Sequence, residues 1–157
     1  MSGTKRAGEA ELTALQAALA AEHAAVYGYG VVGGKIGAGR RDEARTAYDA
    51  HRARRDEWAR AVRDLGGKPE AASAAYALPF AVRDPATAVR LAAELEDRVA
   101  GVYSDLVRAA TGDLRSTAAE ALRESAVRAV RWSGESVAFP GLAERAAGPS
   151  AAAPSKT

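Results

Sequence analysis

The sequence contains no cysteine, which excludes disulfide bonds, thiolate zinc sites, iron–sulfur clusters and cysteine nucleophiles. Aromatic residues are scarce, at 6% of the chain, and no segment alternates with the period of a β-strand. The polar N-terminus lacks the apolar core of a signal peptide, and no apolar run is long enough to span a bilayer. These absences predict a cytoplasmic protein with no membrane partner.

An excess of one charge is also lacking, because 22 basic residues are nearly balanced by 20 acidic ones. A net charge of +2 gives little reason to expect nucleic-acid binding. Alanine is plentiful. It supplies most of an apolar content of 48% and has the highest helix propensity of all residues. The 157 residues are therefore predicted to form one all-α domain.

Apolar periodicity and capping residues predict four helices. The helices are expected to cover residues 9–34, 40–66, 85–110 and 113–133. Around them, residues 1–8 are predicted to be a flexible N-terminus, residues 9–143 a helical bundle and residues 144–157 a disordered tail.

The lengths of the three connections predict the topology. The first and third are short, whereas the second has almost twenty residues and three prolines, enough to run along a whole bundle. Two antiparallel hairpins joined by one long crossover loop are the arrangement of ferritin-like four-helix bundles. The sequence thus predicts this fold class. No internal repeat stands out, although the two hairpins could be distantly related.

Three glycines, Gly28, Gly30 and Gly33, match the GxGxxG pattern of dinucleotide-binding proteins. That pattern requires a strand before it and a helix after it, whereas here an amphipathic helix precedes it and a loop follows. We therefore interpret the three glycines as positions of close helix packing, followed by unwinding into the turn. No cofactor is predicted.

Polar side chains interrupt the apolar stripe of each predicted helix. Glu22 stands where the first helix should bury leucine, His51 lies on the apolar face of the second, and Glu96 lies on that of the third. The fourth helix has Ser125 and Arg128 at the edge of its stripe. A buried carboxylate is costly unless a cation or a hydrogen-bond donor meets it. The rest of the interior is thus expected to neutralise these carboxylates.

Segments around these positions resemble an uncharacterised ferritin-like domain family of high-GC bacteria. The segments are AEHAAVYGYG, AHRARRDEW, LEDRVAGVY and AVRAVRW, and the intervening AYALPF and the terminal FPGL also fit. The resemblance covers residues 12–142 and implies the same bundle fold, but no settled activity. Ferritin-like di-metal sites take a carboxylate from each of two helices and an ExxH pair from each of the other two. Only Glu22, His51 and Glu96 fit those six positions, which predicts a degenerate di-iron site.

Arginine offers a replacement for the missing ions, because a guanidinium is always charged and donates five hydrogen bonds. His23 flanks the same face as Glu22 and is interpreted as a hydrogen-bonded packing residue. We predict a buried polar cluster, completed by tyrosine hydroxyls, that consists of Glu22, His51, Arg55, Glu96 and Arg128. The corresponding function is a non-catalytic binding or structural module, expected to be a homodimer that holds no metal.

Two alternatives stay open. The first is a metal-binding protein or oxidase that uses Glu22, His51 and Glu96 as an altered ligand set. The second is an RNA- or ribosome-associated protein that binds phosphates through the arginine-rich second helix. Interleaved acidic residues argue against this second alternative, since i,i+4 pairs such as Arg52–Asp56 are typical of a solvated helix face. The sequence identifies no small-molecule ligand and no enzymatic activity.

Overall fold

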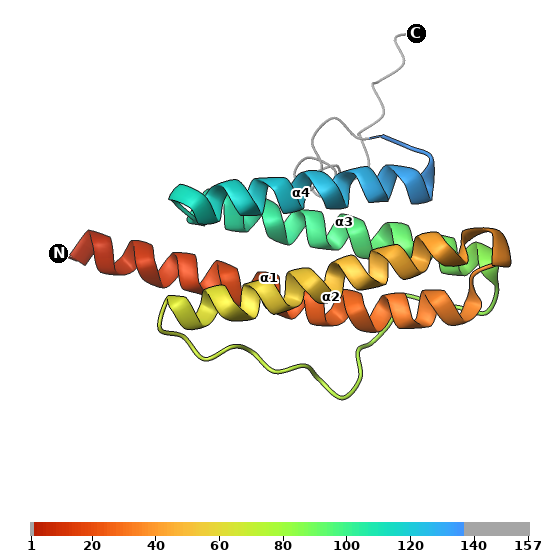
Figure 1. Ribbon diagram of the computed structural model, residues 1–157, viewed down its shortest axis with the longest axis horizontal. Helices are drawn as coiled ribbons and strands as arrows, with labels where there is room; N and C mark the ends of the chain where they lie inside the picture. The colour runs from red at the N-terminus through yellow and green to blue at the C-terminus, as the bar shows by residue number, and fades with distance from the viewer. Residues whose placement is uncertain (1, 137–157) are drawn as a thin grey trace, which may run out of the picture.

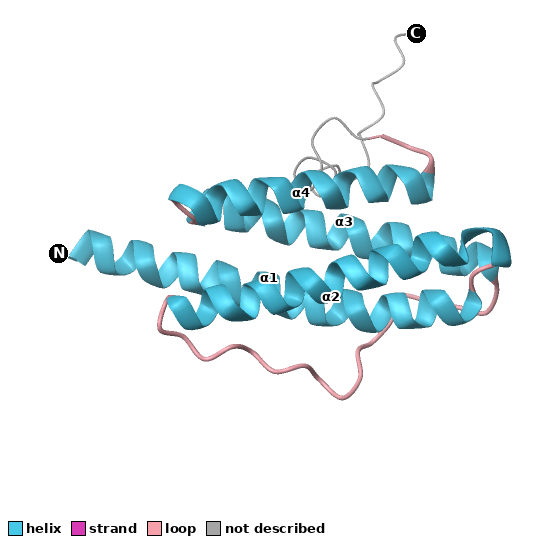
Figure 2. Cartoon of the chain, in the orientation of Figure 1, coloured by secondary structure: helices cyan, strands magenta, loops and turns pink. Residues whose placement is uncertain are grey.

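The computed structural model describes residues 2–136, which form an antiparallel bundle of four long helices (Figure 1). The helices are α1 (Ser2–Lys35), α2 (Arg41–Asp64), α3 (Pro85–Ala109) and α4 (Gly112–Ser133), with a short 3₁₀ turn, η1 (Ala38–Arg40), before α2. No strand occurs within residues 2–136 (Figure 2). The predicted all-α four-helix class is confirmed. The segment FPGL and the predicted tail lie outside the described residues.

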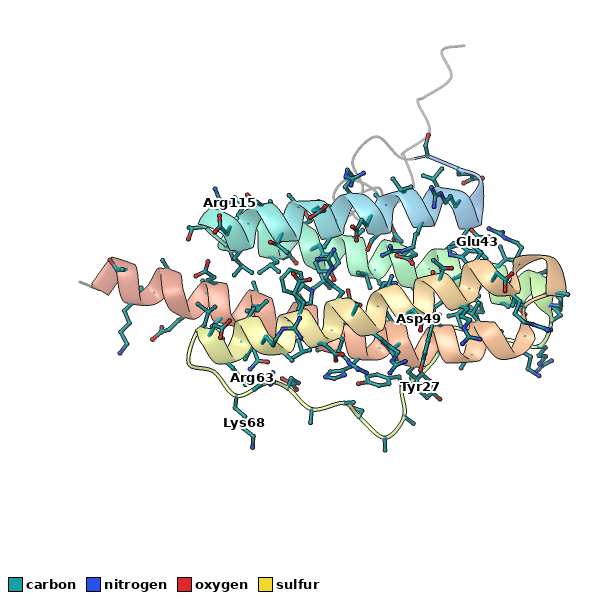
Figure 3. All side chains as sticks on the ribbon, viewed as in Figure 1. Tyr27, Glu43, Asp49, Arg63, Lys68 and Arg115 are labelled. Carbon is teal, nitrogen blue, oxygen red and sulfur yellow. The ribbon has the colours of Figure 1, made fainter. Side chains whose placement is uncertain are left out.

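The connection between α2 and α3 runs along the bundle as an extended crossover loop (Figure 2). Gln16 of α1 holds its beginning, because its Nε2 donates to the carbonyl of Lys68 at 2.6 Å and its Oε1 accepts from the amide of Glu70 at 3.0 Å. The Lys68 side chain itself points away from the bundle (Figure 3). His23 Nε2 donates to the carbonyl of Glu70 at 3.0 Å, so this histidine has the packing role that the sequence predicts.

Local sequence chemistry explains where most helices begin and end. Asp84 caps α3, since its carboxylate accepts from the amide of Thr87 at 2.8 Å and Pro85 occupies the first helical position. Gly66 ends α2 with a φ of +78°, a left-handed conformation that suits glycine. The first helix is longer than predicted, because α1 begins at Ser2 and not at residue 9. Helix-favouring lysine, arginine and alanine in this extra stretch outweigh its two glycines.

The glycines near the end of α1 have different environments, which corrects the interpretation of all three as packing positions. A Cβ on Gly28 would lie 2.6 Å from Cδ1 of Leu95, so α1 and α3 approach closely here. A Cβ on Gly30 or Gly33 would meet no atom within 4 Å. Moreover, the helix does not unwind at these residues but continues to Lys35. Close packing is therefore correct for Gly28 and wrong for Gly30 and Gly33.

Two apolar clusters fill the interior of the bundle. One cluster is built around Leu15, Leu19, Trp58, Tyr103 and Leu106. The other is built around Tyr29, Val32, Leu91, Leu95 and Trp132, and the crossover loop adds Leu78, Phe80 and Val82 to it. Each cluster contains one buried tyrosine and one buried tryptophan, and these aromatic residues lead into the polar centre of the bundle.

Candidate functional site

Each of the four helices contributes one polar side chain that is buried in the centre of the bundle. These side chains are Glu22 from α1, His51 from α2, Glu96 from α3 and Ser125 from α4, and none is more than 1% exposed. Burial of two carboxylates at such depth requires partners for both. The surrounding side chains supply most of those partners.

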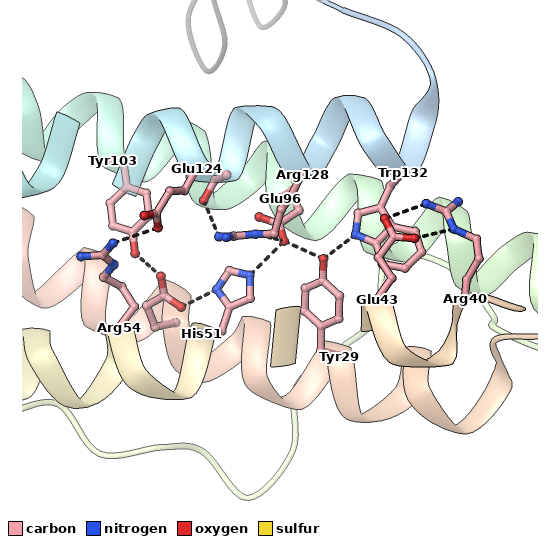
Figure 4. Close-up of polar contacts among 12 residues, drawn as sticks. Tyr29, Arg40, Glu43, His51, Arg54, Glu96, Tyr103, Glu124, Arg128 and Trp132 are labelled. Atoms are coloured by element: carbon pink, nitrogen blue, oxygen red, sulfur yellow. Dashed lines mark hydrogen bonds and ion pairs between the residues drawn. The ribbon is translucent and has the colours of Figure 1, made fainter. Parts of the chain in front are cut away.

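His51 bridges the two carboxylates (Figure 4). Its Nδ1 lies 2.6 Å from Oε2 of Glu22, and its Nε2 lies 3.0 Å from Oε1 of Glu96. Each ring nitrogen therefore faces a carboxylate oxygen, and both contacts are hydrogen bonds when the ring carries two protons. This arrangement favours the imidazolium form of His51.

Glu96 is the most heavily contacted acid of the centre. Besides His51, its Oε1 accepts from the hydroxyl of Tyr29 at 2.6 Å and from Nε of Arg128 at 2.8 Å. The buried Oε2 makes no hydrogen bond with any of the described residues. Arg128 reaches in from α4, where its Nη2 also lies 3.4 Å from the Ser125 hydroxyl. Three donors thus meet on one oxygen of Glu96.

A tyrosine–tryptophan pair continues the hydrogen bonding at each end. On the Glu22 side, the hydroxyl of Tyr103 donates to Oε1 of Glu22 and accepts from Nε1 of Trp58 at 3.0 Å. On the Glu96 side, the hydroxyl of Tyr29 accepts from Nε1 of Trp132 at 2.8 Å. We call the full set the central network; it comprises Glu22, Tyr29, His51, Trp58, Glu96, Tyr103, Ser125, Arg128 and Trp132.

The central network repeats itself between the two helical hairpins. Glu96 follows Glu22 by 74 positions (96 minus 22), and the same offset relates Tyr29 to Tyr103 and Trp58 to Trp132. The halves differ at one buried position, where His51 of α2 corresponds to Ser125 of α4. Serine carries no charge, and the second cation is Arg128, whose equivalent in the first hairpin, Arg54, pairs with Glu124 instead. The two hairpins are thus related at their polar centre, a repeat that the sequence analysis did not detect.

Electrostatics fix the protonation states in the centre. Burial alone would lower the pKa of His51, but the neighbouring Glu22 carboxylate and the hydrogen bonds to Glu22 and Glu96 raise that pKa to about 9. Burial would raise the pKa of Glu96, yet His51 and Arg128 hold it below its usual value. Burial and the adjacent carboxylates raise the pKa of Tyr29 and of Tyr103. At neutral pH the centre thus holds two carboxylates and two cations.

The arginines are distributed differently from the prediction. Arg128 reaches Glu96, but Arg55 lies outside the central network and pairs with its neighbour Asp56 at 2.8 Å. Its side chain keeps 26% exposure and with it part of its hydration. The preceding residue, Arg54, is turned by about 100° around the helix and binds Glu124 of α4 at 2.9 Å (Figure 4). The prediction that Arg55 belongs to the buried cluster is therefore wrong.

The sequence analysis did not single out the two tryptophans or say which tyrosines complete the cluster. One signal would have found them, because an aromatic residue stands seven positions after each central polar residue. Tyr29 follows Glu22 in this way, Trp58 follows His51, and Tyr103 and Trp132 repeat the pattern in the second hairpin. Seven residues make two helical turns, so both members of each pair share one face.

The predicted three-residue metal ligand set is brought together, but as a hydrogen-bonded bridge. Within residues 2–136, no group of three or more histidine, aspartate or glutamate side chains is arranged to hold a metal ion. His51 turns one nitrogen to Glu22 and the other to Glu96, and a protonated imidazole has no lone pair for a metal. These donors do not fit a bound ion in their present arrangement.

The arginine-rich face of α2 also differs from the expected pattern. The predicted i,i+4 pairs, such as Arg52–Asp56, do not form among the described residues. Arg52 instead lies 4.0 Å from Asp49, and Asp56 pairs with Arg55.

No helix within residues 2–136 has the length and apolar character needed to cross a membrane.

The fold and its centre define a class of protein: a four-helix bundle whose buried carboxylates are paired with the protein's own histidine and arginine. The chain belongs to the family described as a domain of unknown function (DUF4439), which matches residues 14–144. It is 40% identical to a conserved hypothetical protein, rv2844, from Mycobacterium tuberculosis, whose crystal structure superposes with a TM-score of 0.78. The alignment covers 80% of this chain and 96% of that one. No curated protein matches the chain.

These matches confirm the predicted membership of an uncharacterised family. They assign no activity, ligand or partner to it. The predicted relationship to ferritins rests on the topology and on the positions of Glu22, His51 and Glu96, and it stays a prediction.

Proposed function

We propose that this protein is a non-catalytic binding or structural module, built on a ferritin-like bundle whose di-metal site has been replaced by internal ion pairs. The observation that carries the proposal is the position of His51, with one nitrogen on Glu22 and the other on Glu96. An imidazolium at that point occupies the space between the two carboxylates, where a metal ion would otherwise bind them both.

The charge balance supports this proposal. The carboxylates of Glu22 and Glu96 are matched by His51 and Arg128, which leaves no net charge for an added cation to neutralise. A divalent ion would have to displace a proton from His51, whose pKa is raised to about 9, and that displacement opposes binding.

Burial supports a non-catalytic role. Glu22, His51 and Glu96 are each at most 1% exposed, so no substrate can reach them in this conformation. Catalytic acids and bases must come within hydrogen-bond distance of a reacting group. The central network therefore stabilises the bundle, and the surface of the bundle carries its binding function.

Metal titration tests the proposal. Addition of Fe²⁺, Mn²⁺ or Zn²⁺ at neutral pH is expected to leave the melting temperature unchanged, because a ligand stabilises a fold only in proportion to its binding. Elemental analysis of the purified protein is expected to find no stoichiometric metal. A bound ion that raises the melting temperature, and that is lost in His51→Gln but kept in His23→Gln, would establish the metal-binding alternative instead.

The proposal also includes a homodimer, in which two copies of the chain associate through α4. Its outer face exposes Val127 and Val130, at 40% and 36%, beside the partly buried Leu122. Clustered apolar side chains on a surface are typical of protein interfaces. Sedimentation velocity is expected to show a dimer that Val127→Asp dissociates, and a monomeric wild-type protein would contradict this. The cytoplasmic location stays a prediction of the sequence.

A further inference from the structure

A groove of about 320 Å³ lies on the surface between α1 and α2, and Tyr29 of the central network forms part of its lining. We call it the glycine groove; its lining includes Gly30, Gly33, Arg41, Arg45, Tyr48 and Arg52. Small-molecule sites in proteins begin at about this volume. The absence of side chains at Gly30 and Gly33 keeps the groove open, because a Cβ at either position would meet no protein atom within 4 Å.

Gly30 and Gly33 lower the stability of the helix and make no close packing contact that would offset this loss. Glycine in a helix interior is less stable than alanine, since it loses more backbone freedom on folding. Gly28 offsets that cost through its close approach to Leu95, but Gly30 and Gly33 make no such approach. Gly3, Gly8 and Gly34 of α1 also face open space, but only Gly30 and Gly33 line the groove, where a ligand would use that space.

The opposite wall is cationic and carries one aromatic ring. Arg41, Arg45, Tyr48 and Arg52 follow one another at intervals of four, three and four residues, so they share one face of α2 over about 16 Å. Arg41 and Arg45 form no ion pair with any residue in the described range 2–136. Two like charges one turn apart repel each other in the absence of an anion.

The remaining charges of the groove leave room for an anion. Arg52 has its Cζ 5.7 Å from the centre of the Tyr48 ring, and its Nη1 is 4.0 Å from Asp49. Asp49 is the one carboxylate of the described groove lining, against three arginines. The lining therefore has a net positive charge beside a half-buried aromatic face.

We propose that the glycine groove binds a nucleoside phosphate. Guanidinium groups bind phosphate oxygens through charged hydrogen bonds, and Arg41 and Arg45 supply two of them. Aromatic side chains stack on bases of any sequence, a role that Tyr48 fills, with Arg52 next to its ring. The ligand is either a free nucleotide or one unit of a single strand, since both present the same phosphate and base. No residue of the central ion pairs lines the groove, but Tyr29, which donates to Glu96, belongs to both the groove and the central network.

Fluorescence anisotropy of the full chain at low ionic strength tests the site with two probes. One probe is ATP labelled on its ribose with a methylanthraniloyl group, and the other is a labelled single-stranded RNA oligonucleotide. Arg41→Gln/Arg45→Gln is expected to weaken binding of the preferred probe at least about tenfold. Arg60→Gln/Arg63→Gln removes the same charge from exposed positions of α2 outside the groove, and it is expected to have little effect.

Substitutions that fill the groove distinguish an effect on ligand binding from an effect on folding. Gly30→Ala/Gly33→Ala is expected to raise the melting temperature by about 4 °C, because alanine favours the helix, and to weaken binding at least about tenfold. Tyr48→Leu is expected to weaken binding about fivefold or more through lost stacking. Binding of neither probe would overturn the proposal, as would equal losses in the groove variant and the Arg60/Arg63 control. If only one probe binds, and its binding depends on the groove residues, that probe shows whether the ligand is a free nucleotide or part of a single strand.

Discussion

Glu96→Gln is expected to lower the free energy of unfolding by about 3–5 kcal/mol, the cost typical of breaking a buried ion pair from one side. Glutamine keeps the size of the side chain but removes its charge. His51 would keep its contact with Glu22, but Arg128 would lose its carboxylate partner. Urea denaturation at neutral pH measures the effect.

Glu94→Gln is the matched control for this prediction. Glu94 lies two residues earlier on α3 and pairs with Arg98 at 2.9 Å, but both side chains are about half exposed. Exposed ion pairs contribute about 0–1 kcal/mol, so the control is expected to change stability by no more than that. Equal and small losses in the two variants would show that the central ion pairs do not stabilise the bundle.

Between pH 6.5 and pH 9 the free energy of unfolding is expected to fall by about 3 kcal/mol because of His51. The pKa of His51 is raised to about 9 in the folded protein from 6.5 in the unfolded chain. Below pH 6.5 both states hold the proton, and the full stabilisation is present. Above that pH only the folded state retains it, so each further rise favours the unfolded chain until the folded imidazolium itself titrates.

The groups that face His51 do not reverse this trend. Glu22 and Glu96 approach from α1 and α3, Arg128 approaches Glu96 from α4, and the adjacent tyrosines have pKa values raised above 10. The lowered pKa of Glu96 adds a separate loss of stability at acid pH. This loss occurs as the pH falls through the folded-state pKa of the Glu96 carboxyl. Stability is therefore greatest in the weakly acidic range.

Urea denaturation across this pH range, with two histidine variants, isolates the contribution of His51. His51→Gln is expected to be less stable than the wild type and to lose most of the decline between pH 6.5 and pH 9. His23→Gln removes the other histidine of the chain, which contacts the crossover loop, and is expected to keep the decline. A wild-type curve that is flat over this range would show that His51 is neutral in the folded protein.

The sequence was sufficient for the elements of the fold because their signals are local. Asp84 and Pro85 mark the start of α3, and the length of the crossover loop follows directly from the chain. Interruption of an apolar stripe at Glu22, His51 and Glu96 likewise placed these residues inside the bundle. Periodicity along one helix reports which face is buried, and this required no knowledge of the neighbouring helices.

Assignment of the arginines needed the neighbouring helices. Arg54 and Arg55 both flank the buried face of α2, and periodicity does not distinguish them. The position of α4 does, because Glu124 lies within reach of Arg54, while Arg55 turns to Asp56. In the same way, only the approach of α3 separates Gly28, which packs on Leu95, from Gly30 and Gly33, which line an open groove.

The sequence by itself determined an all-α chain of four helices, the crossover loop, and three polar residues buried at the centre. These properties depend on residue order within single helices and on chain length. Only the tertiary structure decided that His51 lies between the two carboxylates, that Arg128 and not Arg55 joins them, and that Tyr29 and Tyr103 complete the network. Each of these contacts joins different helices, and a hydrogen bond depends on distances that packing between helices sets.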